Sequence, residues 1–239
     1  ENHTLLDLLA RLNNTGAGCT GNPAVTRQAV GDDEAAIYTA AGMCPAGDIQ
    51  FVDDQYANLD TRTVEGFDVG FFFDWGTAVG DFRLRYNGSF LTTYEQQAGG
   101  ESADLVAAQA NGLIPSNYPI DGFANLIRRD GNQDQRHTFK LSWKNGPWGA
   151  SFGGRRVGDF YQSSLTLDDG TYYDIPAMST YDGTIDYRFD HGDSDTRIRF
   201  GVKNMFDERA PLADRYFGYF SDAHKDLGRN FYLDVRYRM

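Results

Sequence analysis

The stretch GRNFYLDVRYRM, which forms residues Gly228–Met239, carries the clearest structural pattern in this chain. Apolar and polar residues alternate along it. The apolar set is Phe231, Leu233, Val235, Tyr237 and Met239, and the polar set is Tyr232, Asp234, Arg236 and Arg238. Because successive side chains of a strand point to opposite faces, the stretch predicts a strand with one apolar and one charged face. Most chain ends fray, so a strand here predicts a sheet that holds it.

The same alternation recurs in upstream segments. They are Thr196–Lys203, Tyr181–Phe189, His137–Trp143, Asp81–Phe90 and Phe67–Trp75. A further strand is expected over Trp148–Tyr161, with a β-bulge at Gly153-Gly154 where the alternation slips. The segment Ile49–Leu59 forms either a separate strand or the upper part of one long strand that continues to Trp75. Gly228–Met239 and the five alternating segments each set an aromatic-rich face against a charged one.

Two architectures fit such strands. In a soluble sandwich either face could be the inner one, whereas in an outer-membrane barrel the apolar face meets lipid and the charged face meets a wet lumen. For the barrel, we expect one set of side chains to point outward and a set of arginines to point inward. The outward set is Phe67, Val69, Phe71, Phe73, Phe82, Leu84, Phe200, Val202, Leu233 and Val235, and the inward set is Arg83, Arg85, Arg197, Arg199 and Arg236.

The connections between these strands alternate in length. Residues 76–80, 145–147 and 191–195 form short turns, whereas residues 97–133, 162–177 and 210–227 form long loops. Outer-membrane barrels have this asymmetry, with short turns on the periplasmic side and long loops outside. A sandwich has no physical reason to sort its loops by length at the two ends. The pattern therefore favours the barrel.

Composition limits the classes of function. The chain has 239 residues and a formal net charge of −12, which argues against nucleic-acid binding. Its mean hydropathy is −0.52, and no apolar run is long enough for a membrane-spanning helix. Aromatic residues are abundant at 14%. Barrel strands are only half apolar and escape hydropathy scans, so these values are compatible with a membrane barrel.

Residues 1–47 lack strand signals. Leucines between Leu5 and Leu12 predict a short amphipathic helix, and Asp32–Ala41 predicts a second helix that Asp32 or Asp33 could cap. The two cysteines, Cys19 and Cys44, lie among turn residues in this stretch. We expect a disulfide between them, formed in an oxidising compartment, with two free thiols as the alternative. A metal site is not expected, because no further Cys or His has ligand spacing.

Several motifs together resemble one family. FGVKNMFDERAPL (Phe200–Leu212), followed by LGRNFYLDVRYRM (Leu227–Met239), resembles the C-terminal signature of TonB-dependent outer-membrane receptors. In that signature an Asn-Leu-Phe-Asp-like motif closes the penultimate strand and a Gly-Arg-aromatic segment opens the last. YANLDTRTVEGFDVGFFFDW (Tyr56–Trp75) and GDFRLRYNGSFL (Gly80–Leu91) resemble successive strands, and CTGNPAVTR (Cys19–Arg27) resembles an extracellular loop of one branch. The chain departs from the family in ending on Met239 rather than Phe.

The resemblance implies an all-β fold. The chain would supply about seven or eight strands of an antiparallel transmembrane β-barrel of about twenty-two, with short periplasmic turns and long extracellular loops. Residues 1–47 would form an extracellular loop with short helices and the disulfide, and residues 48–239 the C-terminal barrel strands and loops. The family's plug domain, its energy-coupling box (the TonB box) and the first half or more of its barrel are not recognised here, so we expect this to be the C-terminal part of a larger receptor.

The resemblance also implies a function without enzymatic chemistry. The receptor would actively take up a large, scarce solute, such as a siderophore, a corrinoid or an oligosaccharide, across the outer membrane of a Gram-negative bacterium. Its implied partners are outer-membrane lipid, the solute and an inner-membrane energy-coupling complex that acts through the plug region. No cofactor, catalytic residue or nucleic-acid partner is expected.

Candidate solute contacts are the aromatic and basic residues of the long loops. They are Tyr118, Phe123, Tyr172, Tyr173, Arg215, Tyr216, Phe217, Tyr219 and Phe220, with His224 and Lys225 as further sites for an anionic solute. Aromatic rings could stack on sugars or aryl groups. Alternatively, they pack the loops together or form an aromatic girdle, and the charges are solvated.

Two other functions remain open from the sequence. Eight strands can close a small barrel, which would serve as an adhesin or structural protein. A secreted β-sandwich could bind or cleave polysaccharide. Backbone hydrogen bonds between Gly228–Met239 and the first strand would indicate closure of a small barrel, and apolar faces packed between two sheets would indicate the sandwich.

Overall fold

The computed structural model describes residues 2–13, 18–54, 60–118, 120 and 122–239. The chain divides into two compact units, described separately below. The first comprises residues 1–63 and 95–125, and the second comprises residues 64–94 and 126–239. Three α-helices lie in the described residues, and none of them is long and apolar enough to cross a membrane.

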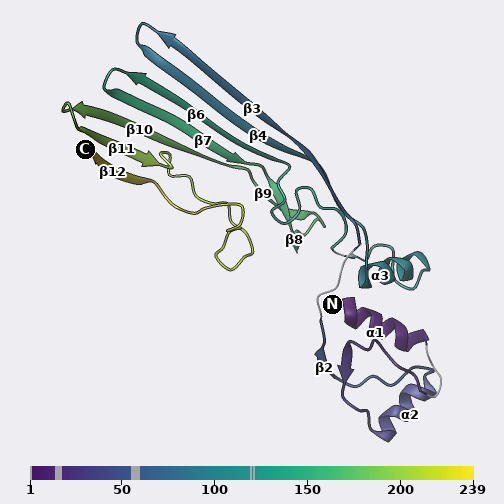
Figure 1. Cartoon of the computed structure of the whole chain (residues 1–239). Helices are drawn as coiled ribbons and strands as arrows, with labels where there is room; N and C mark the ends of the chain where they lie inside the picture. Colours follow the sequence, from purple (N-terminus) through teal and green to yellow (C-terminus); the bar gives the residue numbers. More distant parts are fainter. Residues whose placement is uncertain (1, 14–17, 55–59, 119, 121) are drawn as a thin grey trace. The chain divides into compact units, whose positions relative to one another are not determined.

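The second unit is built on a long antiparallel meander (Figure 1). Its strands are β3 (Arg62–Thr77), β4 (Gly80–Gln96), β6 (Gln135–Asn145), β7 (Trp148–Val157), β10 (Met178–Asp190), β11 (Asp195–Lys203) and β12 (Asn230–Arg238). Each strand pairs with the next one of this series, so the spatial order follows the chain order. The predicted strands are therefore confirmed, with extended bounds for β3, β4 and β10.

Loop lengths sort by end of the sheet. The short turns β3–β4, β6–β7 and β10–β11 lie together at one end, and the long connections leave from the other (Figure 1). The positive φ angles of Gly80, Gly146 and Gly192 show why these turns use glycine, since other side chains rarely adopt that conformation. The predicted alternation of short turns and long loops is confirmed.

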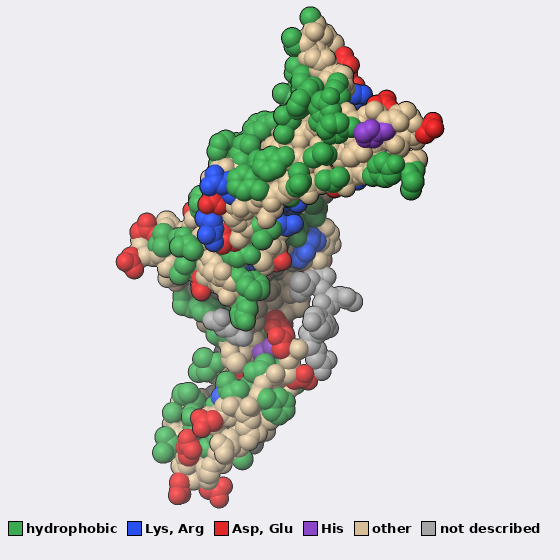
Figure 2. Space-filling model, turned by 90° about the vertical axis from the view of Figure 1, so that its left-hand side faces the viewer, with side chains coloured by type: hydrophobic (Ala, Val, Ile, Leu, Met, Phe, Trp, Pro, Cys, Tyr) green, Lys and Arg blue, Asp and Glu red, His purple; other side chains and the backbone are tan. Residues whose placement is uncertain are grey.

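Most apolar residues of the seven strands share one face. In register, Phe82 lies opposite Trp143, Leu141 opposite Phe152, and Ile185 opposite Phe200, which in turn lies opposite Leu233. On β3 and β4, Trp75 stacks on Phe82 and Phe67 on Phe90. This face stays open: 49% of Phe71 and 67% of Leu233 are exposed, and hydrophobic side chains cover much of the strand surface in Figure 2. The predicted outward set is therefore not packed between two sheets.

The opposite face is polar and internally paired. The Arg197 guanidinium donates two hydrogen bonds to the Asp186 carboxylate, at 3.0 and 2.7 Å, and Arg83 does the same to Asp74 at 2.8 and 2.9 Å. Ser151 and Thr184 share a hydrogen bond of 2.8 Å across β7 and β10. Bidentate pairs of this kind hold each guanidinium group in one orientation.

The predicted bulge at Gly153-Gly154 is wrong. Both glycines pair in unbroken register with β6 on one side and β10 on the other. A side chain at Gly154 would collide with the rings of Phe139 and Tyr181, which lie across it from the neighbouring strands. The glycine therefore provides room for two aromatic rings, the other common reason for glycine in a strand.

The predicted strand Trp148–Tyr161 also needs correction. β7 ends at Val157, and β8 (Phe160–Thr166) turns away to pair with β9 (Tyr172–Ile175) in a separate hairpin within the predicted loop. The large sheet itself is open. Within the part of the chain that the structure describes, β12 and β3 are its two edges and do not pair with each other, so no small closed barrel forms there.

The first unit combines three helices with short strands. They are α1 (Asn2–Asn13), β1 (Val25–Arg27), α2 (Asp32–Ala40), β2 (Ile49–Val52), α3 (Glu101–Ala110) and β5 (Ala124–Asn125). Both predicted helices are confirmed, but α2 is capped by Gly31, so the predicted cap at Asp32 or Asp33 is wrong. β2 pairs with β1 and is separate from β3, while residues 55–59 of the predicted strand lie outside the described residues.

A disulfide and a buried ion-pair network hold the segments of the first unit together. Cys19 and Cys44 form the predicted disulfide, with Cα atoms 5.9 Å apart. The fully buried Asp7 accepts hydrogen bonds from Arg11, from Arg27 at 2.7 Å, and from the Asn22 backbone at 2.9 Å. Burial raises the pKa of Asp7, but the hydrogen bonds from the two arginines outweigh it and hold that pKa below its ordinary value. One carboxylate thus joins α1 to β1.

Candidate functional site: a basic cavity at the loop end of the sheet

The last long loop starts from a tight turn after β11. Asn204 is buried with a φ of +48°, a conformation that asparagine tolerates better than most residues. Its side-chain amide donates to the carbonyls of Glu208 and Leu227, each at 2.8 Å, and its side-chain oxygen accepts from the Glu208 N–H at 2.9 Å. One side chain therefore ties the two ends of the loop together.

An ion pair closes the same loop base. The Arg209 guanidinium donates two hydrogen bonds to the Asp226 carboxylate, at 2.8 and 2.5 Å, and the Ala210 N–H adds a third at 3.0 Å. The hydrogen bonds from Arg209, and then the one from Ala210, lower the pKa of Asp226 to about 2. The backbone N–H of Arg229 donates to Asp207 at 2.7 Å. The motif residues from Asn204 to Arg209 thus act as a structural clasp.

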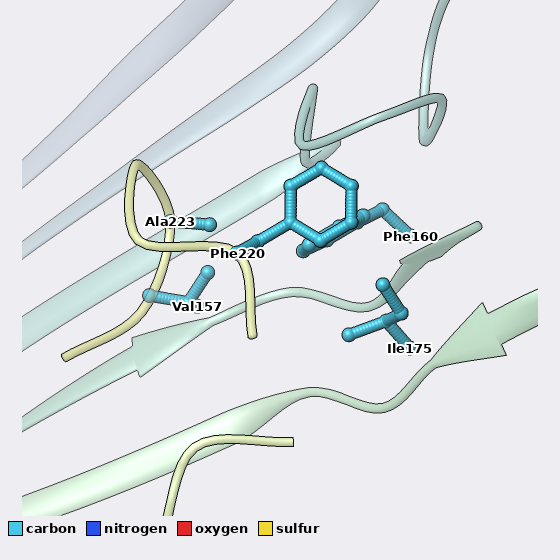
Figure 3. Packing of buried hydrophobic residues seen from close by; sticks show 5 residues of the cluster. All are labelled: Val157, Phe160, Ile175, Phe220 and Ala223. Carbon is cyan, nitrogen blue, oxygen red and sulfur yellow. The ribbon is translucent and has the colours of Figure 1, made fainter. Parts of the chain in front are cut away.

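The loop is held down by an apolar cluster at the loop end of the sheet (Figure 3). Val157 of β7, Phe160 of β8 and Ile175 of β9 meet Phe220 and Ala223 of the loop, and all five are buried. The rings of Phe160 and Phe220 meet edge to face, with centroids 5.0 Å apart. The hairpin β8–β9 therefore serves as the platform on which the last loop rests.

His224 lies at the edge of this cluster. Its ring stacks on Phe160 and only 2% of the residue is exposed. Neither ring nitrogen has a hydrogen-bond partner among the described residues. Burial, followed by the positive charges of Arg155 and Arg136, lowers the pKa of His224. The imidazole is thus held in its neutral form.

A cavity of about 590 Å³ opens beside His224. Its lining comes from the polar face of β7, β10 and β11 and from the last loop. The polar lining includes Arg155, Thr180, Asp182, Lys203, Asn204, His224, Lys225 and Arg229, and the apolar lining includes Val157, Met178, Ala223 and Leu227. Four cations therefore face a single carboxylate, and that carboxylate already accepts the Asn204 N–H at 2.9 Å. The chain as a whole has a net charge of −12, so this cavity is basic in a chain that is acidic overall.

The structure separates the sequence-predicted site residues. Of the second unit's candidates, Tyr172 stacks on Tyr161, Tyr173 packs against the apolar cluster, and the guanidinium of Arg215 lies 4.4 Å from the ring centre of the buried Phe220. Tyr216, Phe217 and Tyr219 form a chain of ring contacts on the last loop, with Tyr216 95% exposed. Tyr118 and Phe123 belong to the first unit, where Tyr118 packs against the core of α3.

Sequence reasoning found two of the cavity residues and missed the others. His224 and Lys225 were candidates, but Arg155, Lys203 and Arg229 were not. A signal for two of these exists in the alternation: Arg155 and Lys203 are charged-face residues at the loop ends of their strands. When neighbouring strands pair, cations at the same ends of those strands come close together. The alternating pattern could therefore have indicated that Arg155 and Lys203 lie near each other.

The comparisons with known proteins agree with this architecture. The model of the family described as TonB dependent receptor-like, beta-barrel matches residues 12–205. This chain belongs to that family. The search of the curated proteins found no match, and neither did the search of the solved structures.

Family membership assigns the chain to outer-membrane solute uptake rather than to an enzyme class. It also offers a reason for the exposed apolar face of the meander, because a TonB-dependent receptor barrel presents an apolar outer face to lipid. The matched range contains both cysteines and the strands β3 to β11. The match thus spans the meander up to β11 and the part of the first unit from residue 12 onward.

Proposed function

We propose that this chain forms part of the wall of an outer-membrane receptor that actively imports a large, scarce solute, such as a siderophore, a corrinoid or an oligosaccharide. The observation that carries this proposal is the two-faced meander. Seven strands share one exposed apolar face and one charged face, and all short turns lie at one end. Burying each large apolar side chain of that face in lipid would contribute about 1.5–3 kcal/mol.

In this proposal, the apolar face is the lipid side and the charged face is the lumen. The turns lie on the periplasmic side, and the long loops, with the disulfide-linked residues 1–47, lie outside. The unpaired backbone groups of β3 and β12 support further strands at both edges, because an open edge is not viable in hydrocarbon. Those strands would bring the barrel to the roughly twenty-two expected for receptors with a plugged lumen.

The basic cavity and the exposed rings Tyr216 and Phe217 are the proposed solute contacts. The last loop carries both rings and part of the cavity lining, and the clasp at Asn204 and the cluster at Phe160 hold this loop in place. The remaining aromatic candidates, Tyr172, Tyr173 and Tyr219, would support that loop or contact the solute. Energy for release would come from an inner-membrane complex acting through a plug domain.

The test is solute depletion by whole cells. Cells with and without the gene are grown in the same medium, and depletion of solutes is followed by mass spectrometry with and without a protonophore. We expect one solute to be depleted only by cells that carry the gene, and only while the membrane is energised. Depletion that the protonophore leaves unchanged, or a protein that fractionates as soluble, would contradict the proposal.

A further inference from the structure

We propose that the cavity beside His224 binds an organic polyanion, a solute with two or more carboxylates on a partly apolar skeleton. This inference rests on the proposed function in taking the ligand to be the imported solute and the apolar face to be the lipid side. It concerns the described residues of β7, β10, β11 and the last loop, all of which belong to the second unit.

The charge of the cavity is the first argument. Arg155, Lys203, Lys225 and Arg229 all line it, and none has a carboxylate within 4 Å among the described residues. The strand arginines nearer the turns differ, because Arg83 and Arg197 are each paired with an aspartate. Unpaired cations gathered around one hollow repel one another, and a bound anion would relieve that repulsion.

The geometry of the donors is the second argument. Arg155 and Lys203 project from paired strands, so their backbone positions are fixed by the sheet. Lys203 lies over the Tyr232 ring at 5.8 Å, and Arg229 donates to the Met205 carbonyl at 3.3 Å, which leaves further N–H groups of both for a ligand. Guanidinium groups bind carboxylates through two parallel hydrogen bonds.

The apolar lining is the third argument, and it separates an organic anion from an inorganic one. Val157, Met178 and Leu227 line the same cavity as the four cations. A phosphate ion would gain nothing from these apolar groups, whereas the hydrocarbon part of an organic acid would contact them and would shield Leu227, which is 71% exposed, from water. The polar-face position also excludes lipid as the source of the anion, because lipid meets the apolar face.

The test is direct binding to the detergent-purified protein by isothermal titration calorimetry. The probe is benzene-1,3,5-tricarboxylate, and its neutral isostere, benzene-1,3,5-tricarboxamide, is the ligand control. We expect the tricarboxylate to bind at least about tenfold more tightly than the amide, and raised salt to weaken it, because exposed charges are screened. Equal binding of both compounds, no binding of the tricarboxylate, or equally tight binding of inorganic phosphate would overturn the inference.

Two adjacent arginines provide a matched pair of variants. Arg155→Gln removes a cation of the cavity, whereas Arg156→Gln makes the same change on the opposite face of β7, where Arg156 contacts Ser179. We expect about a tenfold loss of tricarboxylate affinity for R155Q and no change for R156Q, with Lys203→Gln behaving as R155Q does. Equal affinities for R155Q and R156Q would overturn the assignment.

The two proposals fail separately. If the tricarboxylate does not bind but cells still deplete a solute in an energy-dependent way, only the polyanion site is wrong. If the tricarboxylate binds and depends on Arg155 but no energy-dependent depletion occurs, only the proposed uptake is wrong.

Discussion

The rings of Phe160 and His224 stack with centroids 5.6 Å apart and an angle of 17° between their planes. This contact joins the β8–β9 hairpin to the last loop. It buries a titratable ring against an aromatic one, so we expect the loop to pack less well when His224 is protonated. Protonation would place a charge in an apolar cluster that already lies near Arg155 and Arg136.

The first prediction is a pH-dependent loop. The pKa of His224 is lower in the folded protein than its ordinary value of 6.5, so the opened loop binds the proton more readily. Packing is therefore strongest above pH 6.5 and weakens as the pH falls below it. Hydrogen exchange of the Ala223 and His224 amides, corrected for intrinsic rates, should accelerate several-fold between pH 7.5 and about 5. His224→Phe keeps the stack and should abolish this dependence; an unchanged pH profile would contradict the mechanism.

The second prediction separates packed from exposed rings of the last loop. Phe220 is 3% exposed and Phe217 is 64% exposed. Phe220→Ala removes a buried ring and should cost about 3–5 kcal/mol of local stability, whereas Phe217→Ala should cost little. Limited proteolysis of the loop between residues 210 and 227 measures this. Equal cleavage rates in the two variants would show that the apolar cluster does not hold the loop.

Most strands of the meander were predictable because their period of two persists along the segment and one face is rich in aromatic residues. The same regularity did not extend to short elements. The helix α3 lies in a predicted loop. Helix formers between Gly100 and Gly112 could have indicated it, because Leu105 and Ala108 are three residues apart and share one buried face. The hairpin β8–β9 has too few residues to show a period, and its position depends on contacts with the distant Phe220.

Glycine was the residue that sequence reasoning interpreted wrongly. A glycine in a strand signals either a bulge or a close approach, and only the neighbouring strands decide between them. At Gly154 the decision comes from Phe139 and Tyr181, which belong to different segments. The cavity has the same origin, since Arg155, Lys203 and Arg229 come together only through strand pairing and the closure of the last loop.

The third prediction concerns the ionic link in the first unit. Asp7→Asn leaves Arg11 and Arg27 without their shared carboxylate in a buried position. Removing one partner of a buried ion pair typically costs about 3–5 kcal/mol. Hydrogen exchange of the α1 amides should therefore accelerate strongly. Asp32→Asn, an exposed residue of the first turn of α2, is the matched control and should leave exchange in α1 unchanged. Similar effects of both variants would show that Asp7 is not the link between α1 and β1.

The fourth prediction concerns the clasp at the base of the last loop. The pKa of Asp226 is about 2, below its unfolded value of 3.8, so its contribution is complete above pH 4 and is lost as the pH falls toward 2. Asp226→Asn should imitate this loss at neutral pH and increase exchange of the Ala210 amide, which donates to that carboxylate. Asp222→Asn, on the same loop, is the control. An Ala210 amide that stays protected in D226N would contradict the clasp.

The last prediction tests which face of the meander meets lipid. Leu233 and Asp234 are adjacent on β12 and point to opposite faces, and 67% of Leu233 is exposed. Single cysteines at the two positions, in a background where the native disulfide is kept, are spin-labelled in the protein reconstituted into vesicles. A label at position 233 should collide readily with oxygen, which concentrates in hydrocarbon, and poorly with a water-soluble nickel complex; a label at position 234 should show the reverse. The pair Phe200 and Arg199 on β11 should repeat the alternation, because each lies opposite its β12 counterpart in register. If Leu233 and Phe200 were instead packed between two sheets, both labels there would be immobile and inaccessible to either reagent, and the sandwich would replace the barrel wall.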